Sequence, residues 1–310
     1  TSDPHVGAAA IHESRERITR LERHMKPDAE LLEACDGREI FFENSDGRIV
    51  LMYPILGRVL LGTTDIPIDD PNDAVCTEEE VDYFFDLASH VFPTIALDRS
   101  QIVFRYSGVR PLPVAGDLSP GVVSRDYRIV QDTIEGGQKI LSLIGGKWTT
   151  FRALGEHLAD EALALLRVSR HQSTIGLAIG GGKGFPVTAA ERAQWVQDNK
   201  GSLSAERADQ LLTRYGTVAL SVMEDIAQFG DKPLTHTPHY SVGEIMSLAL
   251  REHVVSLSDL IFRRTLLGFV GEISLQSVSE MGSVISPILE WSEEELAQQV
   301  SLVPVERPQR

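Results

Sequence analysis

The chain has 310 residues, of which 42% are hydrophobic and 24% are charged, a composition typical of globular proteins. Its formal net charge of −16 argues against a nucleic-acid partner, because phosphate backbones are bound by basic surfaces. The two cysteines, Cys35 and Cys76, lack Cys-x-x-Cys spacing, which disfavours a disulfide scaffold or a zinc site and fits a cytoplasmic protein. No apolar run reaches the length of about 20 residues that a membrane-spanning helix needs.

The first part of the chain predicts an arm followed by antiparallel strands. Residues 1–37 are polar and charged, and we expect them to form an arm or a remnant of something larger. From residue 38 the segments REIFFEN, RIVLMYPI and RVLLGTTD are separated by short links that contain glycine, a pattern typical of hairpins. Residues 77–92 predict a helix with Thr77 as its N-cap and Glu80 in the capping-box position.

A second group of strands follows this helix. Residues 101–112, QIVFRYSGVRPL, predict a strand that Pro111 ends. SRDYRIVQDT and KILSLIGG predict another hairpin, and the second of these segments has the composition of a buried strand. An amphipathic helix is expected directly after its two glycines.

The second half of the chain changes to helical spacing. Residues 171–187 are rich in glycine and predict a linker, and residues 188–310 predict an all-helical domain. Helix ends are marked by residues in typical capping positions: Gly216, Gly230, Ser241 with Glu244, and Ser292 with Glu295. The sequence therefore predicts an α+β protein, with a mainly antiparallel sheet domain over residues 38–170 followed by the helical domain.

The segment LSLIGGKWTT joins a strand to a helix through Gly145 and Gly146. The N-terminus of a helix offers free N–H groups and a partial positive charge, and Lys147 adds a full charge there. Such a junction suits an electron-rich ligand. The alternative, which the residues alone leave open, is a tight turn with a solvent-exposed lysine.

Other binding and catalytic motifs are excluded. A phosphate-binding P-loop needs Ser or Thr after its lysine, but Trp148 follows Lys147, and Gly184 follows Lys183 in the GGGKG segment. The nine histidines lack metal-ligand spacing; the pair His236-x-x-His239 is expected in a surface loop, and we predict no metal site. The sequence also contains no Gly-x-Ser-x-Gly motif of a serine hydrolase.

Three arginines are candidates for binding an anion. Arg105 and Arg110 lie in FRYSGVRPL, and Arg110 precedes a proline that would make its backbone rigid. A guanidinium in that position suits bidentate binding of a phosphate or carboxylate. Arg125 in SRDYR could face a ligand in the same way, or pair with Asp126. For each arginine the alternative is a structural ion pair with one of the 45 acidic residues.

Several motifs together resemble one enzyme family. LLGTTDIPIDDP, TEEEVDYFFD, YSGVRPL, SRDYRI and LSLIGGKWTTFR occur in the order and spacing typical of FAD-dependent glycerol-3-phosphate dehydrogenases. LLTRYG and LREHVVSLSDLIFRRTLLGF resemble the C-terminal domain of that family. The resemblance extends over roughly residues 38–295.

The resemblance implies a role for each matching residue. Arg110 would be catalytic and grip substrate oxygens, and Arg125 would be a second substrate-binding arginine. Lys147 would also be catalytic, and Thr149 would cap the helix. The segment that would contact the pyrimidine end of the flavin comprises Gly145, Gly146, Lys147, Trp148 and Thr149.

The resemblance also implies a reaction. Hydride would move from C2 of sn-glycerol 3-phosphate to N5 of FAD and give dihydroxyacetone phosphate, and the electrons would pass to a quinone. The implied protein is a peripheral one on the cytoplasmic, inner face of the cell membrane, and a homodimer is the assembly to test.

One family feature is missing. Members bind FAD through an N-terminal βαβ unit with a Gly-x-Gly-x-x-Gly turn, whereas residues 1–37 contain only Gly7 and Gly37. We therefore expect a C-terminal part of such an enzyme that alone binds FAD weakly or not at all and is inactive. Two alternatives remain: a non-catalytic module that senses polyol phosphates or docks on a partner, and another FAD oxidoreductase of the same superfamily.

Overall fold

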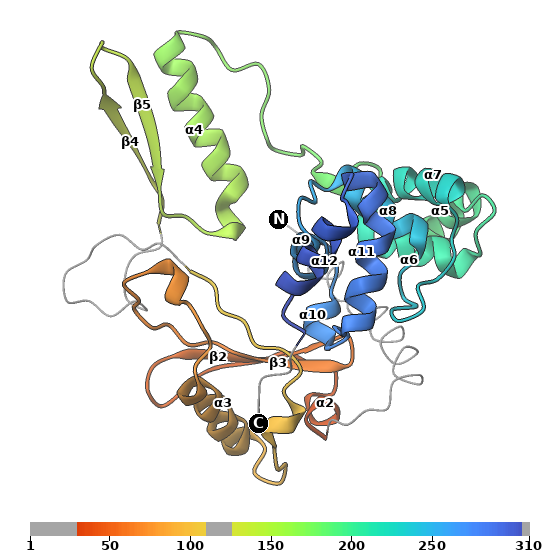
Figure 1. Cartoon of the computed structure of the whole chain (residues 1–310). Helices are drawn as coiled ribbons and strands as arrows, with labels where there is room; N and C mark the ends of the chain where they lie inside the picture. Colours follow the sequence, from red (N-terminus) through yellow and green to blue (C-terminus); the bar gives the residue numbers. More distant parts are fainter. Residues whose placement is uncertain (1–29, 110–125, 306–310) are drawn as a thin grey trace. The chain divides into compact units, whose positions relative to one another are not determined.

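The computed structural model describes residues 30–109 and 126–305, and its contacts divide the chain into two compact units (Figure 1). Unit 1 contains the described residues up to Gln101 together with Arg105–Leu177. Unit 2 contains the residues from Ala178 onward together with a short piece of the first half, Ile102–Phe104. The helical half of the chain thus includes three residues that lie far earlier in the sequence.

Unit 1 begins with the predicted antiparallel strands. Strands β1 (Ile40–Glu43), β2 (Ile49–Ile55) and β3 (Arg58–Gly62) pair in the order β1-β2-β3, each antiparallel to its neighbour. Val50 and Met52 alternate along β2 and are fully buried on one face. The hairpins predicted from the sequence are therefore confirmed.

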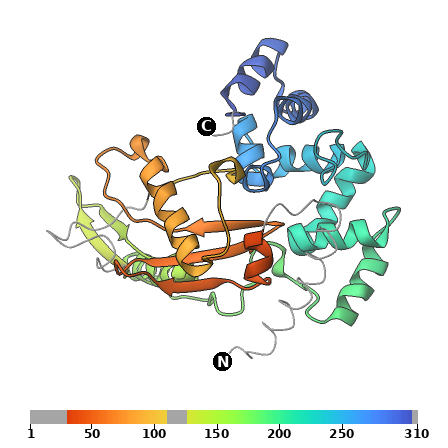
Figure 2. The ribbon, with the colours of Figure 1, turned by 90° about the horizontal axis from the view of Figure 1, so that it is seen from below.

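Two helices pack against this buried face. Helix α2 (Glu30–Cys35) and helix α3 (Glu78–Val91) share one apolar cluster with the sheet, to which α2 contributes Cys35 and α3 contributes Leu87 and Ala88 (Figures 1 and 2). Residues 30–35, which the sequence suggested were part of a polar arm, are thus a helix with three buried side chains.

The capping box predicted at the start of α3 is confirmed. The Thr77 hydroxyl accepts the N–H of Glu80 at 3.3 Å, and the Glu80 carboxylate accepts the N–H of Thr77 at 2.8 Å. Between β3 and α3 the chain forms a short 3₁₀ turn at Pro71–Asp73, which Asp70 caps by accepting the N–H of Asn72 at 2.8 Å.

The strand predicted over residues 101–112 is wrong within the described part. Residues Arg99–Gln101 form a 3₁₀ turn, and residues 102–109 pair with no strand of the described chain. The reason is that their apolar side chains pack on helices: Ile102–Phe104 belong to the helical unit. Residues 110–112 lie outside the described residues.

The second predicted hairpin and its helix are present. Strands β4 (Arg128–Thr133) and β5 (Lys139–Ile144) are antiparallel, and helix α4 (Phe151–Leu166) contacts β5 (Figure 1). The predicted burial of β5 is wrong, because Ile140 and Leu143 are 41% and 39% exposed. A two-stranded sheet covered by one helix leaves much of its apolar surface open.

The chain that leaves α4 runs back along it. The Glu156 carboxylate accepts the N–H of Thr174 at 2.9 Å and the hydroxyls of Ser173 and Thr174. Arg170 binds Asp160 of the same helix at 2.6 Å. The hydrogen bonds from Thr174 and Ser173 hold the pKa of Glu156 below its ordinary value. Residues 170–174 are therefore fixed to α4 by polar contacts.

Unit 2 is helical beyond residue 188, as the sequence predicts. Its helices are α5 (Ala189–Asn199), α6 (Ala205–Tyr215), α7 (Ala219–Phe229), α8 (Val242–Arg251), α9 (Leu257–Asp259), the π-helix η6 (Leu260–Arg264), α10 (Leu267–Val270), α11 (Leu275–Leu289) and α12 (Glu293–Leu302). One apolar core lies among α5, α6 and α7, and a second forms around α8, α9 and α11. Gly216 and Gly230 have positive φ angles at the ends of α6 and α7, as expected for helix-terminating glycines.

The second core is joined to α6 through one fully buried carboxylate, Glu244. The Ser241 hydroxyl accepts the Glu244 N–H at 3.3 Å, so half of the predicted capping box forms. The carboxylate instead accepts hydrogen bonds from Arg207 at 2.8 Å and from Arg214 and the Tyr215 hydroxyl at 2.7 Å each. Burial and the neighbouring carboxylate raise the pKa of Tyr215 well above its ordinary value, so it stays a donor.

Neutralising this carboxylate should destabilise the helical unit. Glu244→Gln leaves the guanidiniums of Arg207 and Arg214, which are 14% and 23% exposed, facing a neutral amide. We expect a loss of about 3 kcal/mol in the free energy of unfolding. Urea denaturation followed by far-UV circular dichroism measures it.

The matched control is Glu224→Gln, at an exposed position on the neighbouring helix α7. Its unfolding free energy should stay within about 0.5 kcal/mol of the parent protein. Equal losses in the two variants would show that the buried network contributes no more than a surface charge.

Candidate functional site

The candidate site forms where β5 passes into α4. Gly145 and Gly146 leave the strand with φ angles of +79° and +106°. Lys147 is extended, with φ −131° and ψ 153°, and a 3₁₀ turn over Trp148–Thr150 leads into α4. We call the residues Gly145–Thr150 the junction.

Both glycines are required by the protein's own chain. A Cβ atom on Gly145 would lie 2.8 Å from the carbonyl oxygen of Asp126, and one on Gly146 would lie 2.8 Å from Cδ1 of Leu154. The tight-turn interpretation therefore explains why these two residues are glycine. The same contact brings the segment that follows Arg125 against the junction.

Tyr127 and His157 connect the start of β4 to α4. The Tyr127 hydroxyl lies 3.3 Å from Nδ1 of His157, and the two rings meet edge to face with centroids 5.8 Å apart. Sequence reasoning missed both residues. Tyr127 could have been found because it lies inside the SRDYR motif, whereas His157 carries no local signal.

The helix cap predicted at Thr149 is wrong by one residue. Thr150 is the N-cap of α4, and its hydroxyl donates to the Lys147 carbonyl at 3.1 Å and accepts the Lys147 N–H at 3.3 Å. The Thr150 side chain makes no capping hydrogen bond to α4, because its hydroxyl is used by the preceding 3₁₀ turn. The first turn of α4 therefore keeps the partial positive charge of an uncapped helix end.

The side chains of residues 147–149 in the junction are exposed to solvent. Trp148 is 93% exposed, and Lys147 is exposed beside it. Within residues 30–109 and 126–305, the Lys147 ammonium makes neither a hydrogen bond nor an ion pair. The junction can therefore offer a positive charge, backbone N–H groups and an indole to the edge of an electron-rich ring.

Of the three candidate arginines, the structure describes one. Arg105 binds the Glu78 carboxylate at 2.6 Å, so its structural ion pair is confirmed. The hydrogen bond from Arg105, together with the charge of Arg99, holds the pKa of Glu78 below its ordinary value. Arg110 and Arg125 lie outside the described residues.

The glycines of the GGGKG segment serve packing inside unit 2. Gly180–Gly182 form a 3₁₀ turn, and a Cβ atom on Gly181 would overlap the Tyr215 carbonyl and the backbone of Gly216. The Thr217 hydroxyl donates to the carbonyl oxygens of Gly181 and Lys183 at 3.0 and 2.8 Å. These contacts agree with the exclusion of a P-loop from the sequence.

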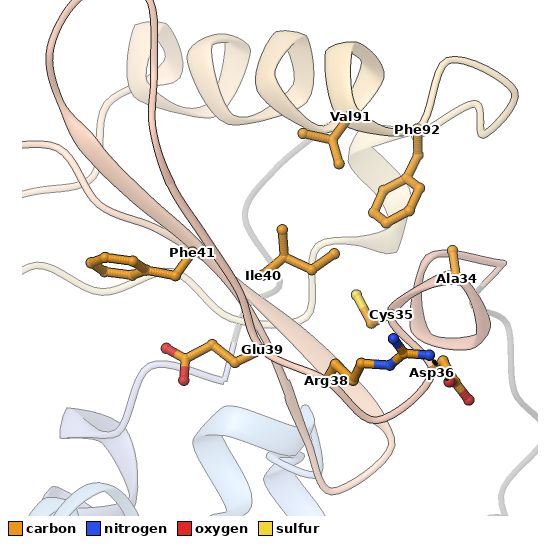
Figure 3. Close-up of a pocket in the computed structure, with 9 residues that line it drawn as sticks. All are labelled: Ala34, Cys35, Asp36, Arg38, Glu39, Ile40, Phe41, Val91 and Phe92. Carbon is orange, nitrogen blue, oxygen red and sulfur yellow. Dashed lines mark hydrogen bonds and ion pairs between the residues drawn. The ribbon is translucent and has the colours of Figure 1, made fainter.

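A separate hollow of about 490 Å³ lies beside α2, β1 and the end of α3 (Figure 3). Its arginine, Arg38, is already paired with Asp36 at 2.7 Å. Burial raises the pKa of the Cys35 thiol and so makes it a poorer nucleophile. The remaining walls are mainly apolar, with Phe41 and Phe92 among them. We assign it no catalytic role.

The described ranges lack two further kinds of site. These residues contain no cluster of three or more histidine, cysteine, aspartate or glutamate side chains that could hold a metal ion. The helices that the structure describes are all too short or too polar to cross a bilayer.

Comparison with known proteins shows the family. Residues 15–160 match the family described as FAD dependent oxidoreductase, and residues 172–296 match the C-terminal domain of alpha-glycerophosphate oxidase. The chain belongs to the FAD-dependent glycerol-3-phosphate dehydrogenase family.

Two relatives agree with this assignment, and one solved structure has a similar fold. The glycerol-3-phosphate dehydrogenase of Synechocystis is 27% identical over 82% of this chain and 46% of its own length. That of Pseudomonas tolaasii is 31% identical over 73% of this chain and 44% of its own length. The structure of the Bacillus halodurans enzyme, solved with FAD, has a TM-score of 0.68 at 22% identity and covers 85% of this chain and 51% of that one. The chain therefore spans about half the length of the relatives it matches, or less.

Adding a methyl group at the first glycine of the junction should loosen it. In Gly145→Ala the new Cβ meets a backbone oxygen at 2.8 Å, and the φ of +79° is unfavourable for alanine. We expect a loss of about 1–3 kcal/mol in local stability. Amide hydrogen exchange of β4, β5 and α4 measures it.

Gly155→Ala is the control, because it lies within α4 and its Cβ would meet nothing within 4 Å. This variant should stabilise α4 by up to about 1 kcal/mol, since alanine favours helix. If Gly145→Ala slows exchange as Gly155→Ala does, the structure has room for a Cβ atom at residue 145 and the steric argument is wrong.

Proposed function

We propose that this chain is the substrate-side part of an enzyme that oxidises sn-glycerol 3-phosphate to dihydroxyacetone phosphate with FAD as the hydride acceptor. The observation that carries the proposal is the junction, where an exposed Lys147 and the uncapped N-terminus of α4 adjoin one another. The family assignment and the names of the relatives support the reaction class.

The junction fits one edge of a flavin ring. FAD, when bound, supplies the hydride acceptor at N5, and negative charge then develops at the pyrimidine edge. Lys147 and the N–H groups at Trp148 and Thr149 would stabilise that charge. Gly145 and Gly146 hold this segment at a fixed angle to β5. No Gly-x-Gly-x-x-Gly turn for the pyrophosphate occurs in the sequence, so we expect this chain alone to bind FAD weakly.

The substrate would be held by arginines. Arg110 and Arg125 match the positions of substrate arginines in the family resemblance, and a guanidinium binds a phosphate with two parallel hydrogen bonds. Arg105, whose partner is Glu78, is not part of this set. In a chain with a net charge of −16, a phosphorylated substrate needs such a local cluster.

We extend the proposal to the fate of the electrons and to the site of action. A quinone would receive the electrons, and the protein would act as a peripheral protein on the cytoplasmic face of the cell membrane. A homodimer is the proposed assembly. These statements are supported by the family resemblance.

Removing the first substrate arginine should abolish most activity. In a polypeptide that joins this chain to the FAD-binding βαβ unit of the family, Arg110→Ala should lower the rate of flavin reduction by glycerol 3-phosphate about 100-fold or more. Loss of the flavin absorbance in stopped flow measures the rate. The control is Arg128→Ala at an exposed position on β4, which should keep the parent rate.

Measuring the binding of glycerol 3-phosphate distinguishes the proposed enzyme from a non-catalytic module. If glycerol 3-phosphate binds in calorimetry but never reduces the flavin, the chain senses polyol phosphates and the proposed reaction is wrong. If glycerol binds as tightly as glycerol 3-phosphate, the arginines do not recognise a phosphate.

Lys147→Met tests the junction itself. Loss of the ammonium should slow flavin reduction about tenfold or more and leave the affinity for glycerol 3-phosphate nearly unchanged, because the charge acts on the reduced ring. Lys139→Met, at an exposed lysine on β5, is the control. Single-turnover rates that are equal for the two variants would remove Lys147 from the mechanism.

A further inference from the structure

The first and last residues of the segment Arg99–Arg105, which we call the arch, bind the same carboxylate. Arg99 and Arg105 both bind Glu78 in the first turn of α3, Arg105 at 2.6 Å. Arg99 also binds Asp82, one turn further along the helix. Both ends of the arch are therefore bound to the Glu78 side chain.

The middle of the arch is part of the helical unit. Ile102–Phe104 cluster with unit 2, although the residues on either side belong to unit 1. The ring of Phe104 stacks on Phe262 of the π-helix η6, with centroids 5.9 Å apart and an interplanar angle of 16°. It also meets Phe269 of α10 at 5.6 Å. Aromatic pairs at these separations stabilise each other beyond simple burial.

Two glycines, Gly268 in α10 and Gly271 directly after it, make room for the arch. A Cβ atom on Gly268 would lie 3.3 Å from the Phe104 ring. One on Gly271, whose φ is +72°, would lie 2.6 Å from Cβ of Val103. The glycines of the LLGFVG segment therefore form a groove that is filled by Val103 and Phe104. A π-helix next to it is a feature often found at functional sites.

The contacts in the groove hold the arch more strongly than the ion pairs with Glu78 do. The Glu78, Arg99 and Arg105 side chains are 59%, 43% and 23% exposed, and ion pairs of an exposed carboxylate contribute little stability. Phe104 is half-buried, and its ring contacts two other aromatic rings. The ion pairs orient the arch, and the aromatic contacts fix it.

We propose that Val103 and Phe104 are positioning residues, through which the helical unit fixes the backbone of residues 105–109. In the sequence, Arg110 directly follows these residues. That Arg110 binds substrate rests on the proposed function; the coupling between the groove and the arch does not.

Hydrogen exchange on the whole chain tests the coupling from both sides. Phe104→Ala should speed exchange about tenfold in η6 and α10 and in residues 105–109, because the groove loses its occupant. Gly271→Ala should do the same in residues 99–109, because its Cβ displaces Val103. Phe41→Ala, at a 63% exposed phenylalanine on β1, is the control and should change neither region.

Phe104→Leu keeps an apolar side chain in the groove and should restore most of the protection from exchange. This second variant keeps the test decisive if Phe104→Ala fails to fold. Unchanged exchange in η6 and α10 for Phe104→Ala, or in residues 99–109 for Gly271→Ala, overturns the proposal. With the FAD-binding unit attached, Phe104→Ala should raise KM for glycerol 3-phosphate about tenfold and leave kcat within about twofold. A parent protein that glycerol 3-phosphate cannot reduce contradicts the proposed function, whereas the exchange data still decide the coupling.

Discussion

Between β5 and α4 the backbone turns through two residues with positive φ, Gly145 and Gly146, and the candidate site takes its shape from that turn. The space beside Gly145 is filled by the Asp126 carbonyl, and the space beside Gly146 by the Leu154 side chain. These glycines therefore do not admit a ligand to the backbone at their own positions. The groups available for a ligand begin at Lys147, where the chain becomes extended and exposed. The structural interpretation therefore explains the two glycines, and the functional interpretation is a proposal for the residues from Lys147 onward.

The charge balance of the chain gives Lys147 its significance. With a net charge of −16, acidic partners are abundant, and the described arginines discussed above are paired: Arg105 with Glu78, and Arg207 and Arg214 with Glu244. A cation that no described acid neutralises provides a local positive field within a negative molecule. The proposed recognition of a flavin edge and of a phosphate would then depend on a few positions and not on the surface as a whole.

Local spacing was enough to predict many helix caps and turns, but it could not identify tertiary partners. The boxes at Thr77 and Ser292 form in full, because each needs only groups three residues apart. Ser241 and Glu244 have the same spacing, yet the carboxylate turns to Arg207, which no local pattern reveals. The strand predicted at residues 101–112 failed for the same reason: an apolar extended segment can pack on a helix as well as on a strand. At the site, the junction was predictable, whereas its contact with Asp126 was not.

The glycines of this chain show how one residue type can support opposite interpretations. The GGGKG segment resembles a phosphate loop in composition, but Gly181 is crowded by the backbone of Gly216, so its lack of a side chain serves packing. Gly268 and Gly271 likewise look like ordinary helix-end residues until Val103 is found against them. In each case the glycine marks a place where a distant segment passes close to the backbone. A larger side chain at Val103 would therefore need a wider groove at α10, and the two segments must change together although they are far apart in the sequence.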